Sequence, residues 1–366
     1  MTDYTSIRHA LHEQPQTAGN EQFAHDTIVK HLQTLHPTKV YTNVGGYGVI
    51  AVWGSNPQAP TIAFRADTDA LPIGHRCGHD GHTTILLRLA ELVDEKFSIF
   101  NSQFSILLIW QPAEETGTGS RAVLDTCILQ QYNIKAIYGL HNLPSYPLGT
   151  VVLCPHTFAA ASTGVVYRLD GRETHASTPE LGINPGLAVA EIINKFNGFM
   201  DYREAGKLSD FRQSTLICVR LGQPAFGTSA GHAEVMFTLR AFTNAAMEHL
   251  LSDANNAVEE IAARYGLTVN CSLVEPFRAT ENSPDCVKAI EKAAQDMPLN
   301  VVYKDIPNRW SEDFAEYLLE FPGAMFGIGS GEHQPELHHP DYDFPDALIE
   351  PAAQLFFNLC RSSSPA

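Results

Sequence analysis

The chain has 366 residues, which is more than one hydrophobic core usually holds, so we expect two domains. The formal net charge is -17, and a surface this acidic repels nucleic acids and anionic membranes, so we expect neither as a partner. No apolar run reaches the roughly 18 residues of a membrane span, and the start lacks the apolar core of a secretory signal. The seven scattered cysteines do not suggest a disulfide framework, so we expect a cytoplasmic protein.

The first part of the chain alternates between helical and apolar strand patterns. Residues 4–36 predict an amphipathic helical segment that is interrupted near Pro15. The other expected elements are a pair of strands at 44–54 and 61–73, a helix at 79–97, and apolar strands at 104–115 and 135–144. This alternation predicts an α/β fold with a mixed, mostly parallel sheet flanked by helices.

A different pattern begins near residue 164. An edge-type strand is expected first, then a helix at 185–200, strands at 214–222 and 233–243, a helix at 247–266 and a last strand at 267–276. This order predicts a ferredoxin-like α+β domain of residues 164–274, inserted into a catalytic metal-binding domain of residues 1–163 and 275–366.

Potential metal ligands lie in four short segments, each at or near the end of an apolar run. They are Cys77, His79, Glu115, His141 and His338. A thiolate, imidazoles and a carboxylate together suit Zn²⁺, Mn²⁺ or Co²⁺. Neighbours on an extended segment face opposite ways, so the residues alone leave His338 and His339 as alternatives for the last ligand. A polar cluster without a metal is the competing interpretation.

Carboxylates next to these ligands could provide catalysis and orientation. Glu114 adjoins Glu115 and could act as the base beside a metal-activated water, although a solvated acidic loop is the simpler alternative. Asp67 and Asp69 share one face of a strand, and either could orient a ligating imidazole. Asp67 could instead be a turn residue or a partner of Arg65. His82 could contact the ligands or could be a packing histidine.

The motifs as a set resemble the metal-dependent amidohydrolase family that includes hippurate hydrolases, N-acetyl-diaminopimelate deacetylases and plant auxin-conjugate hydrolases. The resemblance covers nearly the whole chain and rests on IRHALHEQP, RADTDALPI, HRCGHDGHT, QPAEE, GLHNLP, THAS, SEDF and LHHPDYDF. It implies the fold of dinuclear zinc exopeptidases and two divalent ions held by Cys77, His79, Glu115, His141 and His338. It also implies Glu114 as the general base and Asp69 as the carboxylate that supports the ligands.

The resemblance extends to the inserted domain, which it identifies as a lid and possible homodimer contact. It implies that His175 reaches the reaction centre and that Arg240 binds the substrate carboxylate. An ordinary turn histidine and a surface arginine are the alternatives. The chain reads GTSAGHAE at residues 227–234, where relatives commonly carry Asn-Val-Ile-Pro, so substrate preference is expected to differ.

The implied activity is hydrolysis of the amide bond of N-acyl amino acids or similar small conjugates. An aminopeptidase or dipeptidase of the same superfamily would share the site but would recognise a free amine. A binding protein without turnover would keep the fold, and a structural metal site would need only four ligands.

Overall fold

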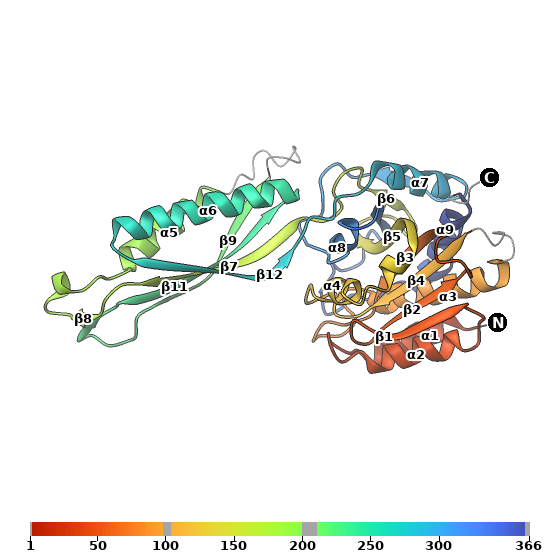
Figure 1. The fold of residues 1–366 in the computed structure, drawn as a ribbon, viewed down its shortest axis with the longest axis horizontal. Coiled ribbons are helices and arrows are strands. Elements are labelled where there is room, and N and C mark those ends of the chain that lie inside the picture. Colours follow the sequence, from red (N-terminus) through yellow and green to blue (C-terminus); the bar gives the residue numbers. More distant parts are fainter. Residues whose placement is uncertain (1, 98–103, 200–210, 363–366) are drawn as a thin grey trace. The chain divides into compact units, whose positions relative to one another are not determined.

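The computed structural model describes residues 2–97, 104–199 and 211–362, which form two compact units (Figure 1). Unit 1 comprises Met1–Phe158, Thr280–Asp305 and Asp313–Ala366, and unit 2 comprises Ala159–Ala279 and Ile306–Glu312. The sequence places the inserted domain at 164–274, inside the limits of unit 2, and that assignment stays a prediction.

Unit 1 is built on an eight-stranded mixed sheet (Figure 1). In spatial order its strands are β1 (Lys39–Val44), β2 (Gly48–Trp53), β4 (Ser105–Gln111), β3 (Pro60–Asp67), β5 (Asn133–Pro144), β14 (Gly323–Gly331), β6 (Val151–Leu153) and β13 (Val301–Tyr303). Strands β4, β3, β5 and β14 run parallel to one another, as do β6 and β13. This arrangement confirms the predicted α/β class.

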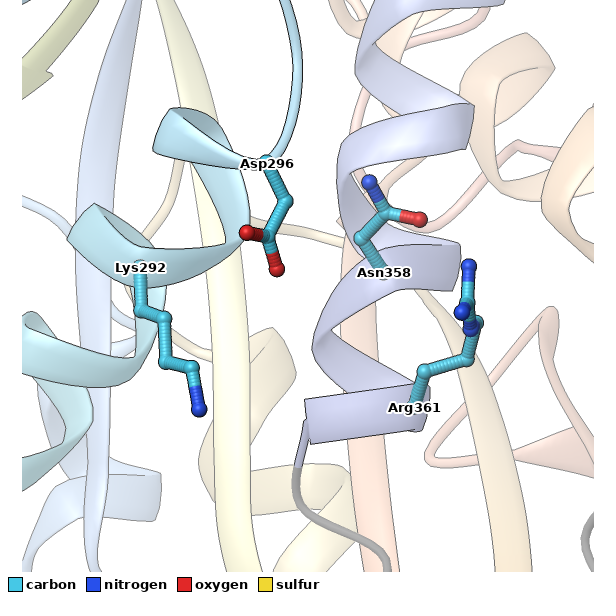
Figure 2. Close-up of a pocket in the computed structure, with 4 residues that line it drawn as sticks. All are labelled: Lys292, Asp296, Asn358 and Arg361. Carbon is cyan, nitrogen blue, oxygen red and sulfur yellow. The ribbon is translucent and has the colours of Figure 1, made fainter.

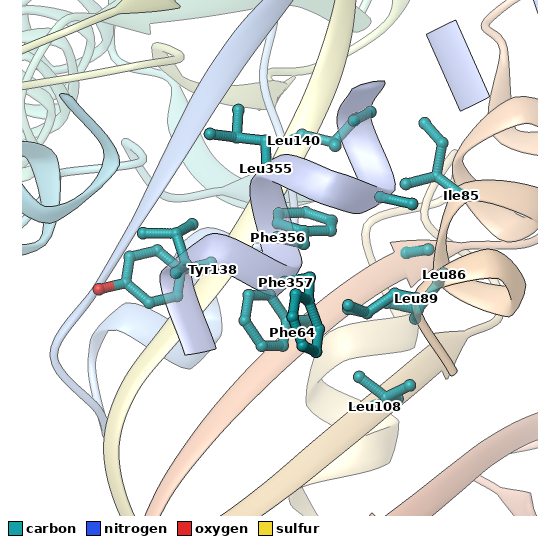
Figure 3. Packing of buried hydrophobic residues seen from close by; sticks show 14 of the residues in the cluster. Phe64, Ile85, Leu86, Leu89, Leu108, Tyr138, Leu140, Leu355, Phe356 and Phe357 are labelled. Atoms are coloured by element: carbon teal, nitrogen blue, oxygen red, sulfur yellow. The ribbon is translucent and has the colours of Figure 1, made fainter. Parts of the chain in front are cut away.

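Helices cover both faces of this sheet. The helices of unit 1 are α1 (Tyr4–Glu13), α2 (Gln22–Leu32), α3 (His79–Lys96), α4 (Gly119–Leu124), α7 (Pro284–Gln295), α8 (Ala315–Leu318) and α9 (Ile349–Ser362). The main hydrophobic core lies between the sheet and α2, α3, α7 and α9. Figure 3 shows Phe64 of β3 and Leu108 of β4 beneath Phe356 of α9, and the Phe64 and Phe356 ring centroids are 4.9 Å apart. Burial on both faces explains why the central strands are continuous apolar runs.

One predicted pairing is wrong. Strands β2 and β3 do not pair, because β4 lies between them, antiparallel to β2 and parallel to β3. The hairpin partner of β2 is β1, joined through Gly45 and Gly46 at φ values of 60° and 115°. Strand β1 lies at the edge and exposes most of its side chains, so it lacks the apolar pattern that would have indicated it.

Unit 2 contains a four-stranded antiparallel sheet. Its spatial order is β12 (Thr268–Phe277), β7 (Ala161–Asp170), β11 (His232–Ala241) and β9 (Arg212–Leu221). Helices α5 (Gly186–Asn197) and α6 (Asn244–Arg264) bury their apolar faces on this sheet. A separate two-residue pairing joins β8 (Thr174–His175) to β10 (Thr228–Ser229).

Strand β7 was expected at an edge, and this prediction is wrong because β7 lies between β12 and β11. Only Arg168 and Asp170, near its end, are exposed, and their polarity gave the misleading edge pattern. Within the described parts of the chain, no helix is both long and apolar enough to cross a membrane.

Candidate functional site

The five predicted metal ligands all belong to unit 1 and come from the ends of its central elements. Cys77 and His79 flank the start of α3, Glu115 follows β4, His141 lies in β5, and His338 lies in the loop after β14. The structure brings together the ligand atoms of Cys77, His79 and His141, and likewise those of Cys77, Glu115 and His338, each set within 4.8 Å of one another.

Gly78 gives the backbone the shape that this convergence needs. It precedes α3 with a φ of 99°, a left-handed conformation that glycine adopts without strain. A Cβ atom at this position would lie 2.5 Å from Oδ1 of Asn142. Glycine therefore allows both the turn between Cys77 and His79 and the close approach of Asn142.

The distances between donor atoms suit bound cations. Sγ of Cys77 lies 3.5 Å from Nε2 of His141, and Oε1 of Glu115 lies 3.8 Å from Nε2 of His79 and 4.0 Å from Nε2 of His338. Two ligands of one tetrahedral zinc ion are expected about 3.3 to 3.8 Å apart, from their bond lengths to the metal. The spacing therefore leaves room for ions between these side chains.

Two of these atoms are buried without a hydrogen bond. Nε2 of His79 and Oε1 of Glu115 have no hydrogen-bond partner among the described residues. An unsatisfied buried polar group costs about 1 to 3 kcal/mol, and a cation between the two atoms would satisfy both. The residues present therefore fit a metal site, and this fit does not depend on any relative.

Burial and neighbouring charges together set the pKa values of the predicted ligands. Burial raises the pKa of Glu115 to about 7 against the opposing charge of His79, and it raises the pKa of the Cys77 thiol well above its usual value. Burial opposes the charge of His79, but Asp67 and Cys77 raise the pKa of its imidazole well above the usual value. Burial, with help from His82, lowers the pKa of His141 well below the usual value. A cation must therefore displace protons from Cys77, His79 and Glu115.

A buried chain of hydrogen bonds runs beneath Cys77. Nδ1 of His82 lies 2.7 Å from Oδ1 of Asp67, and Nε2 lies 2.5 Å from Oδ1 of Asn142. Nδ2 of Asn142 donates to the carbonyl oxygen of Cys77 at 3.0 Å. His82, which the sequence left undecided, thus supports the backbone of a predicted ligand. Sequence reasoning missed Asn142, although it directly follows His141 in GLHNLP.

Asp69 holds the turn that carries the two adjacent glutamates. Its Oδ1 accepts from the backbone N–H of Glu114 and its Oδ2 from that of Glu115, each at 3.0 Å. Nδ1 of His79 also lies 2.9 Å from the backbone oxygen of Asp69. Asp67 contacts Arg65 at 2.5 Å, which is the ion pair that the sequence allowed as an alternative, in addition to its contact with His82.

Sequence reasoning gave no role to Asp313, which belongs to the SEDF motif. Its backbone N–H lies 3.4 Å from Oε1 of the buried Glu114. Its carboxylate accepts hydrogen bonds from Arg65 at 2.8 Å, from Gln111 and from the backbone N–H of Ser120. Burial raises the pKa of Asp313 to about 6 even though Arg65 opposes the shift. Arg65 and Asp313 are 248 positions apart, so no local signal could have joined them.

His338 and His339 differ in their surroundings. His338 adopts a left-handed φ of 66° and donates its N–H to the carbonyl of Arg76 at 2.9 Å. Nδ1 of His339 accepts from the backbone N–H of Asp341 at 3.2 Å. The structure thus brings His338, and not His339, to Glu115.

The remaining predicted residues lie in unit 2. His175 is exposed, and its Nδ1 lies 2.7 Å from Oγ of Ser177. Arg240 donates to the backbone oxygen of Arg309 at 2.7 Å and to Oγ of Ser311 at 3.2 Å, both within the same unit. Burial lowers the pKa of Arg240. The roles of His175 and Arg240 in the reaction stay predictions.

A polar pocket of about 450 Å³ lies between α7 and α9 (Figure 2). Its described lining is Lys292, Asp296, Asn358 and Arg361. This lining contains none of the predicted ligands, so we place the candidate site at the strand ends and not in this pocket.

Comparisons with known proteins show which proteins this chain resembles over nearly its whole length. The chain is 28% identical to an N-acetyldiaminopimelate deacetylase of Lacticaseibacillus casei, over 95% of this chain and 94% of the relative. It is 26% identical to an N-acetylcysteine deacetylase of Bacillus subtilis, over 98% of this chain and 96% of the relative. The crystal structure of the Bacillus subtilis YXEP protein, described as a dinuclear metal binding peptidase, matches with a TM-score of 0.84 and 25% identity, over 98% and 96% of the two chains.

A family model described as peptidase family M20/M25/M40 matches residues 63–362. This match confirms the resemblance seen in the motifs, and it confirms the expectation of a hydrolase that acts on amide bonds. The chain belongs to peptidase family M20/M25/M40.

Proposed function

We propose that this protein hydrolyses the amide bond of N-acyl amino acids or similar small conjugates, with two divalent metal ions held at the strand ends. The proposed ligands are Cys77, His79, Glu115, His141 and His338. The observation that carries the proposal is that buried atoms of His79 and Glu115 have no hydrogen-bond partner among the described residues, next to a second glutamate on the same turn. The deacetylase names of two relatives and the dinuclear description of the Bacillus structure support it.

When bound, zinc, manganese or cobalt would lower the pKa of a water molecule and polarise the amide carbonyl. The protein's own part centres on Glu114, which would accept the proton of the attacking water and return it to the departing amine. The turn that carries Glu114 is held by Asp69 and faces the backbone of Asp313, so its carboxylate is already oriented.

The proposal also gives roles in substrate binding and catalysis to two residues of unit 2. His175 would donate a hydrogen bond to the oxyanion that forms on the carbonyl oxygen when water attacks the carbonyl carbon. Arg240 would bind the free carboxylate of the substrate through a paired hydrogen bond. The pairing of Thr228 with His175 makes the GTSAGHAE stretch a neighbour of His175, so we expect this stretch to affect which acyl groups are accepted.

We also propose a homodimer that forms through unit 2. Strand β9 lies at the edge of its sheet and exposes Leu216, Ile217, Val219 and Leu221. An unpaired apolar edge strand is a natural pairing surface for a second copy. Sedimentation analysis should show a dimer that Ile217→Lys weakens, and a monomeric parent protein would contradict the proposal.

A cytoplasmic location remains part of the proposal. All seven cysteines are described and free, which supports a reducing compartment. Cell fractionation would test it, and recovery outside the cytoplasm would contradict it.

The function is tested by releasing free amino acids from a panel of N-acyl amino acids and unblocked dipeptides. The protein is stripped with a chelator and assayed before and after Zn²⁺, Mn²⁺ or Co²⁺ is added back. We expect metal-restored cleavage of the N-acyl substrates. Cleavage of dipeptides alone would favour a dipeptidase, and binding of ions without turnover would favour a binding protein.

A further inference from the structure

The backbone that carries Glu114 and Glu115 is held by two buried carboxylates. Three consecutive N–H groups point at them. Oε1 of Glu21 accepts from Ala113 at 2.9 Å, and Asp69 accepts from Glu114 and Glu115 at 3.0 Å each. Asp69 was expected from the sequence, but Glu21 was not, because it lies 92 positions from Ala113.

The turn needs this support because Ala113 has a φ of 55°. The left-handed conformation costs a residue with a Cβ atom about 1 to 2 kcal/mol, and it persists only where the surroundings enforce it. Downstream of the turn, Glu115 extends toward His79 at 3.8 Å, and Glu114 extends toward the backbone nitrogen of Asp313 at 3.4 Å. A change of φ at Ala113 would redirect both side chains.

Among the described residues, the Glu21 side chain accepts hydrogen bonds from two backbone N–H groups, those of Ala113 and Gly19. Glu21 is 0% exposed, and its side chain makes no capping hydrogen bond to α2, the helix that it precedes. Its Oε1 also accepts from the N–H of Gly19 at 3.0 Å, while its Oε2 has no hydrogen-bond partner among the described residues. A buried carboxylate with one unpaired oxygen weakens the fold, and of its two hydrogen bonds the one to Ala113 reaches the turn that carries Glu114.

The loop that carries Glu21 is also hydrogen-bonded to the backbone next to Asp69, the second carboxylate that holds the turn. The backbone oxygen of Gln16 accepts from the N–H of Ala70, next to Asp69, at 2.8 Å. The loop between α1 and α2 therefore carries one support, Glu21, and its backbone is bonded to the residue next to the other support, Asp69.

We infer that Glu21 is a positioning residue, which fixes the left-handed turn at Ala113 and so holds Glu114 where it can accept the proton of the attacking water. This inference rests on the proposed role of Glu114. It requires an acceptor oxygen at position 21 and does not require a negative charge there.

The test compares Glu21→Ala with Glu21→Gln, whose amide oxygen can accept the same two N–H bonds. We expect kcat to fall about 10- to 100-fold in Glu21→Ala, by more than any accompanying loss of bound metal and with KM unchanged, because small misplacements of a reacting group have effects of this size. Glu21→Gln should stay close to the parent protein.

A matched control is Asp94→Ala, which removes a carboxylate that accepts from the backbone N–H of His36 at 2.7 Å, near the opposite end of α3 from His79. This control should lower stability without lowering kcat. Adding Ala113→Gly to Glu21→Ala should restore part of kcat, because glycine adopts positive φ freely. This double variant separates the effect on the turn from a general loss of folding.

Crystal structures of the metal-bound variants give a readout without turnover. Residue 113 should leave the left-handed region in Glu21→Ala and keep it in Glu21→Gln. The inference fails if kcat is unchanged in Glu21→Ala, if kcat falls only in proportion to bound metal, or if Glu21→Gln is equally slow. A parent protein that cleaves no N-acyl amino acid would instead refute the proposed function, and the crystal structures would still decide whether Glu21 holds the turn.

Discussion

At the scale of single residues, the predicted ligands are side chains whose charged forms are disfavoured by burial. The Cys77 thiol illustrates this, because burial raises its pKa well above the usual value and keeps it protonated when no cation is near. Thiolate is the form that binds metal, so the ion must supply the energy of deprotonation. Metal affinity and proton release are therefore coupled at this position.

Cys77→Ser should lower metal affinity by at least about 10- to 100-fold, the loss that is typical when even a supporting group of a metal site is removed. Metal retained after dialysis against a buffered ion measures the effect. Cys127→Ser, at an exposed cysteine, is the control and should bind as the parent does. Equal metal retention in the two variants would remove Cys77 from the ligand set.

Residue-scale reasoning from the sequence found the groups that stand at strand ends and missed those that act across the fold. Cys77, Glu115 and His141 follow or end apolar runs, so their convergence could be predicted. Glu21 and Asp313 could not, because their partners are joined only by the tertiary structure.

At the scale of elements, α3 determines where His79 lies, and its first turn is tightly packed. A Cβ atom on Gly81 would lie 2.3 Å from the ring of Phe344, which is buried. Gly81→Ala should destabilise the protein by about 1 to 3 kcal/mol through overpacking, in spite of alanine's higher helix preference of about 0.5 to 1 kcal/mol. Denaturant unfolding measures this free energy.

The control for that change is Gly227→Ala, where φ is ordinary and no atom of the described residues, apart from the chain neighbours, lies within 4 Å of the added Cβ. It should unfold at nearly the parent's denaturant midpoint. A Gly81→Ala variant as stable as this control would show that Phe344 moves aside easily.

Helix α2 should make stability depend on pH. His31 is buried near its end with its ring 5.7 Å from that of Tyr4, and burial lowers the pKa of His31 below 6.5. The folded state therefore holds this imidazole neutral, so its contribution to stability is lost as the pH falls below 6.5 toward the lowered pKa. The free energy of unfolding of the metal-free protein should fall less in His31→Leu between pH 7.5 and pH 5. Parallel losses in the two proteins would contradict this account.

Element types were predictable where the apolar pattern was strong, as in the helical spacing of α3 and the continuous apolar run of β4. Pairings were not, because β1 exposes its side chains and β4 inserts between β2 and β3. No local sequence pattern indicates either of these pairings.

At the scale of the whole molecule, each unit has its own main hydrophobic core, and all five predicted ligands lie in unit 1. A ligand at about 1,000 times its dissociation constant stabilises the folded state by about 4 kcal/mol. Differential scanning calorimetry should therefore show one transition that a chelator lowers and one that it leaves in place. Two transitions that shift equally on chelation would contradict the assignment of the ligands to one unit.

In the proposed reaction Glu114 transfers the proton, while other residues hold the metal ions. The most direct measurement is metal content and turnover of an N-acyl amino acid, made together on Glu114→Gln and the parent protein. We predict unchanged metal content and a kcat lower by about 10²- to 10⁴-fold, the usual contribution of a general base. Turnover at the parent rate with full metal content would contradict the account.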